Sequence, residues 1–356
     1  MIPLSRPSLT PQDHAAVSEV LASGMLVQGA NVARFEAGVA ARVGRRHAIA
    51  VSNGTAALVL SLEALGIGAG DEVLVPALTW PSPAHAIRLV GATPVLVDVD
   101  PLEWNVRGGA LRAARTERTR AAIAIDQFGN PLREDEIRDA TEGLALVEDA
   151  ACAIGSRFAS GRAAGTLGVA SCLSFHPRKV LTTGEGGMVL TDDDALADRL
   201  RRLRNHGQSA PGTFVEPGGN HRMTELAAVL GLGQLGRLDA ILEARTAIAD
   251  GYRASIRKVR FQARPDGATS NEQTFGVVLP DGATATDRDR LVAAIRAAGV
   301  EAGALSYALH RLPSVGVTTP CPVAESLVDR GFSLPLHPGL TEDERAKVVE
   351  TVERLA

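Results

Sequence analysis

Short apolar runs that alternate with helical stretches limit the fold of this chain more than any other feature. The runs lie in the first two-thirds of the sequence, at His47–Val51, Glu72–Val75, Pro94–Val97, Ala121–Ile125, Leu144–Glu148, Cys172–Phe175 and Met188–Leu190. Amphipathic or Ala-rich stretches separate several of them, at Ala56–Leu65, Pro83–Leu89, Gly108–Arg115 and Glu134–Thr141. Strands that are apolar throughout, with helices of this length between them, are typical of a mainly parallel sheet covered on both faces. We therefore expect an α/β fold.

The last third of the chain has a different pattern. Residues Met223–Ile256 form a nearly unbroken helical pattern with an expected bend near Gly231–Gly236. A smaller unit should follow, made of a strand, a helix, an irregular Pro-containing stretch and a last helix, at Thr274–Val278, Asp287–Ala298 and Thr341–Leu355. The pattern predicts a large domain over residues 1–240 and a smaller α+β domain over residues 241–356.

Composition excludes several classes of function. The 356-residue chain has a net charge of −4, so we expect no nucleic-acid surface. No apolar run approaches the roughly 20 residues of a membrane span, and the N-terminus lacks a signal-peptide pattern. The three cysteines have neither metal-ligand spacing nor the pattern of a disulfide framework. We expect a cytoplasmic protein without a metal site or a membrane partner.

Lysine is scarce in this chain, and one lysine has an unusual setting. The 37 Lys and Arg residues include only three lysines, Lys179, Lys258 and Lys347. Lys179 follows a predicted strand and a proline and precedes the glycine-rich segment Gly184–Gly187, which lets another group approach the backbone. Arginine can replace lysine at most solvated positions, but it cannot form a Schiff base, so Lys179 is a candidate nucleophile. A lysine on an exposed loop is the alternative.

Two further features follow predicted strands. Asp149 comes after the apolar run Leu144–Val147, and ligands bind at the carboxyl ends of strands in open parallel sheets. A carboxylate there could pair with a pyridinium N–H, or it could simply cap a helix or bind loop amides. The Gly54-Thr55 turn opens directly into a helix, so its free amides suit a phosphate, unless it is an ordinary capped turn.

Three more side chains could complete such a site. Trp80 follows the strand Glu72–Val75 and could stack on an aromatic cofactor, although tryptophan more often packs in a core. Ser174 ends its strand, and Asn220 lies in a glycine-rich segment ahead of the long helix. Both could donate a hydrogen bond to a phosphate, although glycine-rich loops often only cap helices.

Motifs along nearly the whole chain resemble those of the DegT/DnrJ/EryC1/StrS sugar aminotransferases. The motifs are Gly24–Glu36, Asn53–Leu58, Val95–Pro101, Glu148–Ala151, Ser174–Lys179, Gly184–Gly187, Asn220–Glu225 and Leu334–Leu340. The resemblance implies a pyridoxal-phosphate (PLP) enzyme with the type I fold of aspartate aminotransferase. It also implies that Lys179 binds the cofactor as a Schiff base and shuttles a proton, that Asp149 pairs with the pyridine nitrogen, and that Trp80 stacks on the ring.

The same resemblance implies which residues bind the cofactor phosphate and how the subunits assemble. The backbone amides of Gly54 and Thr55, with the Ser174 hydroxyl, would hold the phosphate. Asn220 would reach the phosphate from the other subunit, which implies a homodimer with shared active sites. The implied reaction moves an amino group from an amino acid, glutamate in the family, to a keto sugar that is linked to a nucleotide. Pyridoxamine phosphate (PMP) would be the intermediate form of the cofactor.

Two positions depart from the family pattern. Cys152 stands where Gln or His is common, and a thiol is a weak donor toward the cofactor's phenolic oxygen. His221 stands where Tyr is common. Both departures bear on the substrate more than on the type of reaction. The alternatives are an aminotransferase for a cyclitol or another ketone, a PMP-dependent sugar dehydratase, and a non-catalytic cofactor-binding paralogue. Because the dehydratase branch has histidine in place of the lysine, Lys179 favours amino transfer.

Overall fold

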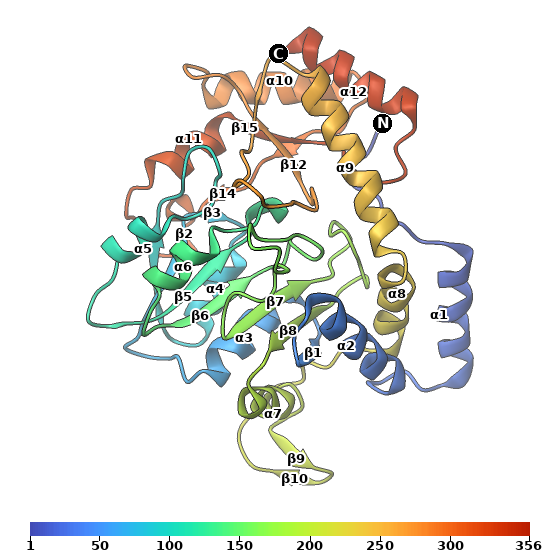
Figure 1. The fold of residues 1–356 in the computed structure, drawn as a ribbon, viewed down its shortest axis with the longest axis vertical. Coiled ribbons are helices and arrows are strands. Elements are labelled where there is room, and N and C mark those ends of the chain that lie inside the picture. The colour runs from blue at the N-terminus through green and yellow to red at the C-terminus, as the bar shows by residue number, and fades with distance from the viewer.

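A seven-stranded sheet forms the centre of the protein in a computed structural model that describes all residues from 1 to 356 (Figure 1). Its strand order is β1-β8-β7-β6-β5-β2-β4. The strands are β1 (His47–Val51), β2 (Glu72–Pro76), β4 (Thr93–Val97), β5 (Thr119–Ile125), β6 (Ala145–Asp149), β7 (Ala170–Ser174) and β8 (Gly187–Thr191). Each predicted strand is present, with its bounds within two residues of the predicted ones.

Strand direction in this sheet decides where its polar strand ends meet. The pairs of neighbours from β7 through β6, β5 and β2 to β4 are all parallel. Only β8 runs against both of its neighbours, β1 and β7. The carboxyl ends of β1, β2, β4, β5, β6 and β7 therefore share one edge, together with the first residue of β8. The predicted mainly parallel sheet is confirmed.

Helices pack around this sheet and connect its strands. They are α2 (Ala30–Val43), α3 (Gly54–Ala64), α4 (Ser82–Leu89), α5 (Gly108–Ala113), α6 (Glu134–Ala140) and α7 (Asp194–Leu203). Helix α1 (Pro11–Ser23) packs instead on α8 (Glu225–Leu235). Helix α3 packs on β6, β7 and β8, because most of its side chains are apolar and buried. A hairpin of β9 (Gln208–Ala210) and β10 (Thr213–Phe214) projects from the lower end of the molecule (Figure 1). None of the helices is long and apolar enough to cross a lipid bilayer.

The predicted long helix is two helices. Helix α8 (Glu225–Leu235) ends at Gly236, and α9 (Leu238–Ser255) starts after Arg237, so the chain breaks where a bend was expected. Helix α9 leads to an antiparallel sheet of β11 (Arg260–Phe261), β12 (Phe275–Val278), β15 (Gly331–Leu334) and β13 (Gly303–Ala304). Helices α10 (Ala285–Ala297), α11 (Pro322–Arg330) and α12 (Glu342–Leu355) complete this part. The stretch predicted as irregular thus contains α11 and several short strands, β13 and β15 among them.

Two buried apolar clusters hold the molecule together. The larger one surrounds the seven-stranded sheet, and the smaller one includes residues of α9, α10, α12, β12 and β15. The larger cluster also takes in side chains from the last third of the chain, including Leu305, Leu309 and Leu327. A two-residue pairing of β3 (Leu78–Thr79) with β14 (Tyr307–Ala308) joins the same two parts. The predicted division at residue 240 falls just inside α9 and stays a prediction.

Helix α3 starts so close to the end of β7 and the start of β8 that only glycine fits at two positions. A Cβ at Gly187 would lie 2.3 Å from the carbonyl oxygen of Asn53, and a Cβ at Gly54 would lie 2.9 Å from the Cβ of Ser174. Backbone atoms cannot move aside as a flexible side chain can. The amino end of α3 is therefore held directly against Ser174.

We predict that Gly187→Ala lowers the free energy of unfolding by about 2–4 kcal/mol, because the new methyl group overlaps the Asn53 carbonyl. The matched control is Gly251→Ala in α9, where an added Cβ meets nothing within 4 Å. The control should raise stability by about 0.5–1 kcal/mol through helix propensity. Denaturant melts of both variants test this, and equal stabilities would contradict the proposed close approach.

Candidate functional site

The candidate site residues lie mostly at the carboxyl edge of the large sheet. Asp149 is the last residue of β6, and Ser174 is the last residue of β7. Ser174 pairs in register with Gly187, and Asp149 pairs with Cys172 on the neighbouring strand. Because β6 and β7 are parallel neighbours, the structure brings Asp149 and Ser174 to the same edge.

The amino end of α3 has the features of an anion site. Asn53 caps the helix, and its side-chain oxygen accepts a hydrogen bond from the Ala56 amide at 2.8 Å. Gly54 and Thr55 are the first two helical residues, so their N–H groups have no partner within the helix. The Ser174 side chain lies against Gly54, and the Thr55 hydroxyl lies 2.9 Å from the hydroxyl of Ser82. Free amides at a helix amino end, with hydroxyl groups beside them, suit a phosphate.

Lys179 lies half-buried in the turn that follows β7. Its side-chain amine donates a hydrogen bond to the Cys152 sulfur at 3.0 Å. Its own amide donates to the His176 carbonyl at 2.8 Å, which fixes the turn. The alternative of a lysine on an exposed loop does not describe this geometry. The thiol of Cys152, a residue that departs from the family pattern, therefore lies against Lys179, the candidate nucleophile.

Asp149 is a buried carboxylate with few partners. It is 5% exposed, and one of its oxygens accepts a hydrogen bond from the Ala151 amide at 3.1 Å. Burial raises the pKa of Asp149, while the Ala151 hydrogen bond and the positive charge of Lys179 act in the opposite direction. A cation placed against this carboxylate would remove much of the cost of burying its charge.

Glu148, the neighbour of Asp149, has a structural environment. It is fully buried and accepts hydrogen bonds from the Gly165 amide, the Leu167 amide and the Ser171 hydroxyl, at 2.6–2.7 Å. Successive side chains of a strand point to opposite faces of the sheet, so the Glu148 and Asp149 carboxylates lie on opposite faces. These three donors satisfy the hydrogen-bonding needs of the Glu148 carboxylate, so it needs no ligand.

Two polar residues that sequence reasoning missed lie next to this site. Asp126 follows β5 and is fully buried, and its amide donates to the Asp149 carbonyl at 3.1 Å. Burial, and then the nearby Glu148 charge, raise the pKa of Asp126 well above its usual range. Asn271 is also buried, and its side-chain amide donates to the carbonyls of Cys152 and Ile154 at 2.8 and 2.9 Å. No local motif marks either residue, because both contacts join distant parts of the chain.

Trp80 lies on the surface of the chain. Its side chain is 62% exposed and contacts Tyr307 edge-on, with 5.4 Å between the ring centroids. The pairing of β3 with β14 places the two rings together. A packed core position, the commoner role of tryptophan, is thus not what the structure shows for Trp80. Trp104 is the buried tryptophan of this protein.

Asn220 is exposed, and its side chain makes no hydrogen bond within the chain. The segment that carries it lies beside the α3 turn, since the Ser52 amide donates to the His221 carbonyl at 2.8 Å. The structure therefore brings the segment near the anion site without bonding the Asn220 side chain to Ser174, Asp149 or Lys179.

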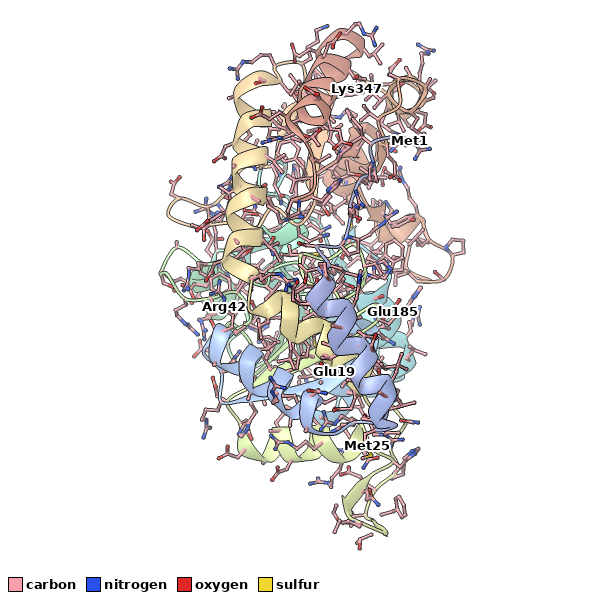
Figure 2. The ribbon with its side chains drawn as sticks, turned by 90° about the vertical axis from the view of Figure 1, so that its right-hand side faces the viewer. Met1, Glu19, Met25, Arg42, Glu185 and Lys347 are labelled. Atoms are coloured by element: carbon pink, nitrogen blue, oxygen red, sulfur yellow. The ribbon has the colours of Figure 1, made fainter.

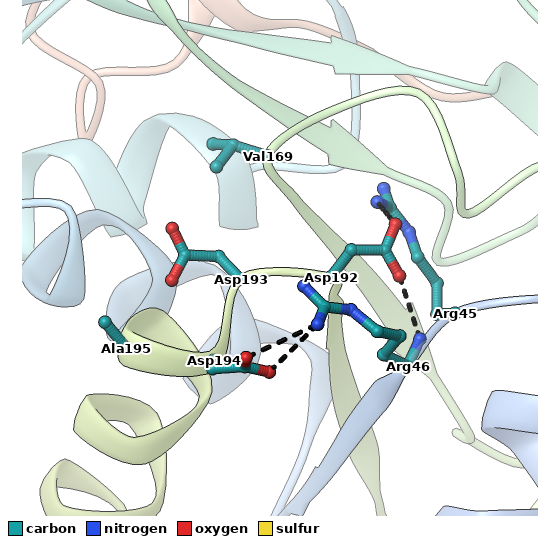
Figure 3. A pocket seen from close by; sticks show the side chains of 7 residues that line it. All are labelled: Arg45, Arg46, Val169, Asp192, Asp193, Asp194 and Ala195. Atoms are coloured by element: carbon teal, nitrogen blue, oxygen red, sulfur yellow. Dashed lines mark hydrogen bonds and ion pairs between the residues drawn. The ribbon is translucent and has the colours of Figure 1, made fainter.

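A surface cavity of about 530 Å³ lies at the opposite edge of the sheet, between residues 45–46, 169 and 192–195 (Figure 3). Its charges are already paired: Arg45 binds Asp192 at 2.8 Å, and Arg46 binds Asp194 at 3.3 Å. Asp193 caps α7. No group of His, Cys, Asp and Glu side chains in the protein is arranged to hold a metal ion. The candidate site residues therefore lie away from this cavity.

Comparison with known proteins identifies the family. The model of the DegT/DnrJ/EryC1/StrS aminotransferase family matches residues 7–353. The chain belongs to this family. Family membership confirms the predicted α/β type I fold, the predicted aminotransferase activity and PLP as the cofactor.

Three similar proteins illustrate the match. GDP-perosamine synthase of Caulobacter vibrioides is 36% identical over 337 residues, which cover 92% of this chain and 90% of that protein. The structure of Spr1654 from Streptococcus pneumoniae in its PMP form has a TM-score of 0.95 and 26% identity, with 99% and 97% of the two chains covered. The sugar aminotransferase CalS13 from Micromonospora echinospora has a TM-score of 0.91 and 31% identity, with 99% and 100% covered. The likeness thus extends over the whole chain.

We predict that Asp149→Asn stabilises the cofactor-free protein at neutral pH. Because the pKa of Asp149 is raised in the folded state, its ionised form opposes folding above that pKa, and the penalty is absent below the unfolded value of about 3.9. Asparagine keeps the acceptor for the Ala151 amide. The melting temperature of the variant should exceed that of the wild type at pH 7, and the difference should disappear in acid. Asp266→Asn, at an exposed turn position, is the control that should change neither value.

Proposed function

We propose that this aminotransferase moves an amino group from glutamate to a keto sugar that is linked to a nucleotide, with PLP held at the carboxyl edge of the large sheet. The observation that carries the proposal is the placement of the Lys179 amine, the Asp149 carboxylate and the free amides of α3 at this one edge. An amine, a buried anion and a phosphate-binding helix end are the groups that such a cofactor needs.

The residues at this edge fit the cofactor. Lys179 would bind it covalently, and Asp149 would pair with its pyridine nitrogen, where a positive charge relieves the buried carboxylate. The amides of Gly54 and Thr55 and the hydroxyl of Ser174 would hold its phosphate. When bound, the cofactor supplies an electron sink for the substrate carbon. Trp80 would cover the ring from the solvent side, in keeping with its exposure.

Proton transfer is the task that this assignment leaves to the chain itself. A proton must leave the donor's α-carbon and later return to the sugar carbon. The Lys179 amine is the basic group that lies among the cofactor residues, and the Cys152 sulfur holds it at 3.0 Å. A general base has to lie within hydrogen-bonding reach of the proton that it takes, so the orientation of this one side chain decides whether it can act as the base.

The names of the relatives support a sugar as the acceptor. GDP-perosamine synthase is named for a nucleotide-linked sugar, and CalS13 is described as a sugar aminotransferase. At 36% identity over 92% of this chain, the first relative supports the same class of acceptor here, a nucleotide-linked keto sugar. Cys152 and His221 depart from the family pattern, so these two residues would make the acceptor of this enzyme differ from the acceptors of other members.

A homodimer with shared sites belongs to the same proposal. Asn220 is exposed and unbonded in the single chain, which supports its assignment to the phosphate of the partner's site. Large apolar side chains are also exposed, with Met25 at 72%, Val27 at 63% and Phe214 at 64%. Met25 lies just beyond α1, at the far end of the molecule from Lys347 (Figure 2). Surface apolar groups of this size commonly lie in protein interfaces.

We predict that the enzyme transfers isotope-labelled nitrogen from glutamate to one member of a panel of nucleotide-linked keto sugars, as read by product mass. Lys179→Ala and Lys179→Arg should lower this transfer by at least about a hundredfold, because neither side chain supplies the amine. Lys258→Arg and Lys347→Arg are the matched controls and should remain near wild-type activity.

Full transfer by Lys179→Ala would overturn the assignment of the lysine. Consumption of a keto sugar without incorporation of labelled nitrogen would instead indicate a dehydratase. Transfer only to non-sugar ketones would show that the acceptor is not a sugar. A protein that stays colourless with added PLP, and in which borohydride fixes no PLP to Lys179, would point to a site that does not bind the cofactor through a lysine.

Mixing two inactive variants tests the shared site. Lys179→Ala keeps Asn220, and Asn220→Asp keeps Lys179 while its carboxylate repels the phosphate. If each site uses Lys179 of one subunit and Asn220 of the other, a mixed dimer regains one complete site. We predict recovery of about a quarter of wild-type activity after subunit exchange at equal concentrations. Activity that stays at the sum of the separate variants would contradict sites shared in this way.

A further inference from the structure

Arg245 is a fully buried arginine whose partners are all backbone carbonyls. It lies on α9, is 4% exposed, and donates to the carbonyls of Asn271, Gln273 and Leu336 at 3.2, 2.8 and 3.1 Å, and to that of Glu272. Burial lowers the pKa of Arg245 to about 10, and the charge of Glu272 opposes this, so the guanidinium is still charged at neutral pH. Three of its four acceptors are consecutive residues, so one side chain fixes the segment 271–273.

This segment has a backbone conformation that needs such support. Glu272 has a φ of +54°, in the left-handed region that non-glycine residues seldom adopt. Its carboxylate forms ion pairs with Arg253 and Arg264, each at 2.8 Å. Residues held in such conformations persist only where their surroundings over-determine them, and they cluster at functional sites. Here the two arginines hold the side chain and Arg245 holds the carbonyl.

The fixed segment contacts both sides of the Lys179–Cys152 hydrogen bond. Asn271 donates to the Cys152 and Ile154 carbonyls, which holds the turn that carries the thiol. Gln273 donates from its side-chain amide to the Arg178 carbonyl at 3.1 Å, one residue before Lys179. The Asn271 side-chain oxygen also accepts from the Gln273 amide at 2.9 Å, which ties the two contacts to each other.

Asn271 approaches the site so closely that the facing residue has to be glycine. A Cβ at Gly129 would lie 2.0 Å from the Asn271 side-chain oxygen and 2.9 Å from the Cys152 carbonyl oxygen. Gly129 has a φ of +89°, which only glycine adopts without strain. The position of the Cys152 turn therefore depends on its contact with Asn271.

We propose that Arg245 is a positioning residue for Lys179, acting through the segment 271–273, which holds the Lys179 and Cys152 turns at their hydrogen-bonding distance. The inference rests on the proposed role of Lys179 as the amine that binds the cofactor and moves the proton. It adds a residue of the C-terminal part of the chain that touches neither cofactor nor substrate. A loss of Arg245 should allow the Lys179 amine to leave Cys152 and become more exposed.

The scarcity of lysine makes this consequence measurable. We expect Arg245→Lys and Gln273→Ala, each in the full-length cofactor-free chain, to raise the rate at which an amine-acylating reagent modifies Lys179 by at least about threefold, as read by mass spectrometry. Lys258 and Lys347 are internal references in the same molecules and should keep their rates. Gln273→Ala removes a bond at the surface, so it tests the inference even if Arg245→Lys folds poorly.

Arg288→Lys is the matched control. Arg288 also donates to two backbone carbonyls, those of Val328 and Gly331, at 2.9 and 3.3 Å. It lies on α10, away from the 271–273 segment. This variant should leave the labelling of Lys179 relative to the two reference lysines unchanged.

The loaded enzyme gives a second readout. A displaced amine slows proton transfer and leaves substrate binding intact, so kcat should fall by about ten- to a hundredfold while KM stays within about twofold. A small primary amine added to the solution should restore part of the lost kcat in both variants and have no effect on the wild type.

Unchanged relative labelling of Lys179 in both variants would overturn the inference. A parallel rise at all three lysines would do the same, because it would indicate general loosening of the fold. Activity in Lys179→Ala would remove the proposed role of the lysine, whereas the labelling result would still decide whether Arg245 positions this side chain. The two failures are therefore distinguishable.

Discussion

The close approach of the α3 amino end to β7 and β8 is the constraint on which the rest of the site depends. Gly187 lets the Asn53 carbonyl come near, and Gly54 lets the Ser174 side chain reach the first turn of the helix. The parallel direction of β6 and β7 then places Asp149 beside them, and the turn after β7 carries Lys179. An amine, a carboxylate and the free amides of a helix end thus gather through backbone geometry before any ligand is considered.

Much of this arrangement could be predicted because its signals are local. Apolar runs marked the strands, and a lysine retained among arginines, with its glycine-rich neighbours, marked Lys179. Some elements escaped for equally local reasons. Helix α11 starts with Pro322 in a stretch that its prolines suggested was irregular, although proline is favoured in the first turn of a helix. Position along the chain suggested that Trp80 could stack on a cofactor and that Asn220 could bind a phosphate. The family motifs added the proposal that Asn220 acts from the other subunit, which no periodicity could give.

The residues that support the turns carrying Lys179 and Cys152 could not be predicted from local sequence signals. Asn271 lies 119 positions from Cys152 in sequence, and Gln273 lies 95 from Arg178. Arg245 looks in the sequence like any other arginine of an amphipathic helix, yet it is buried against carbonyls. Such contacts depend on how the two parts of the chain pack together, and the side chains involved carry no spacing that reveals it. Long-range hydrogen bonds therefore remained invisible to pattern reasoning.

The contacts between residues early and late in this sequence have a consequence for synthesis. Ile2 forms a bridge with Val300, while Leu305, Leu309 and Leu327 complete the cluster around the large sheet. During translation, Ile2 and the strands of the large sheet must wait for partners that lie far later in the sequence. The nascent large sheet therefore spends most of its synthesis with an unfinished apolar surface, the kind of exposure from which chaperones protect a growing chain.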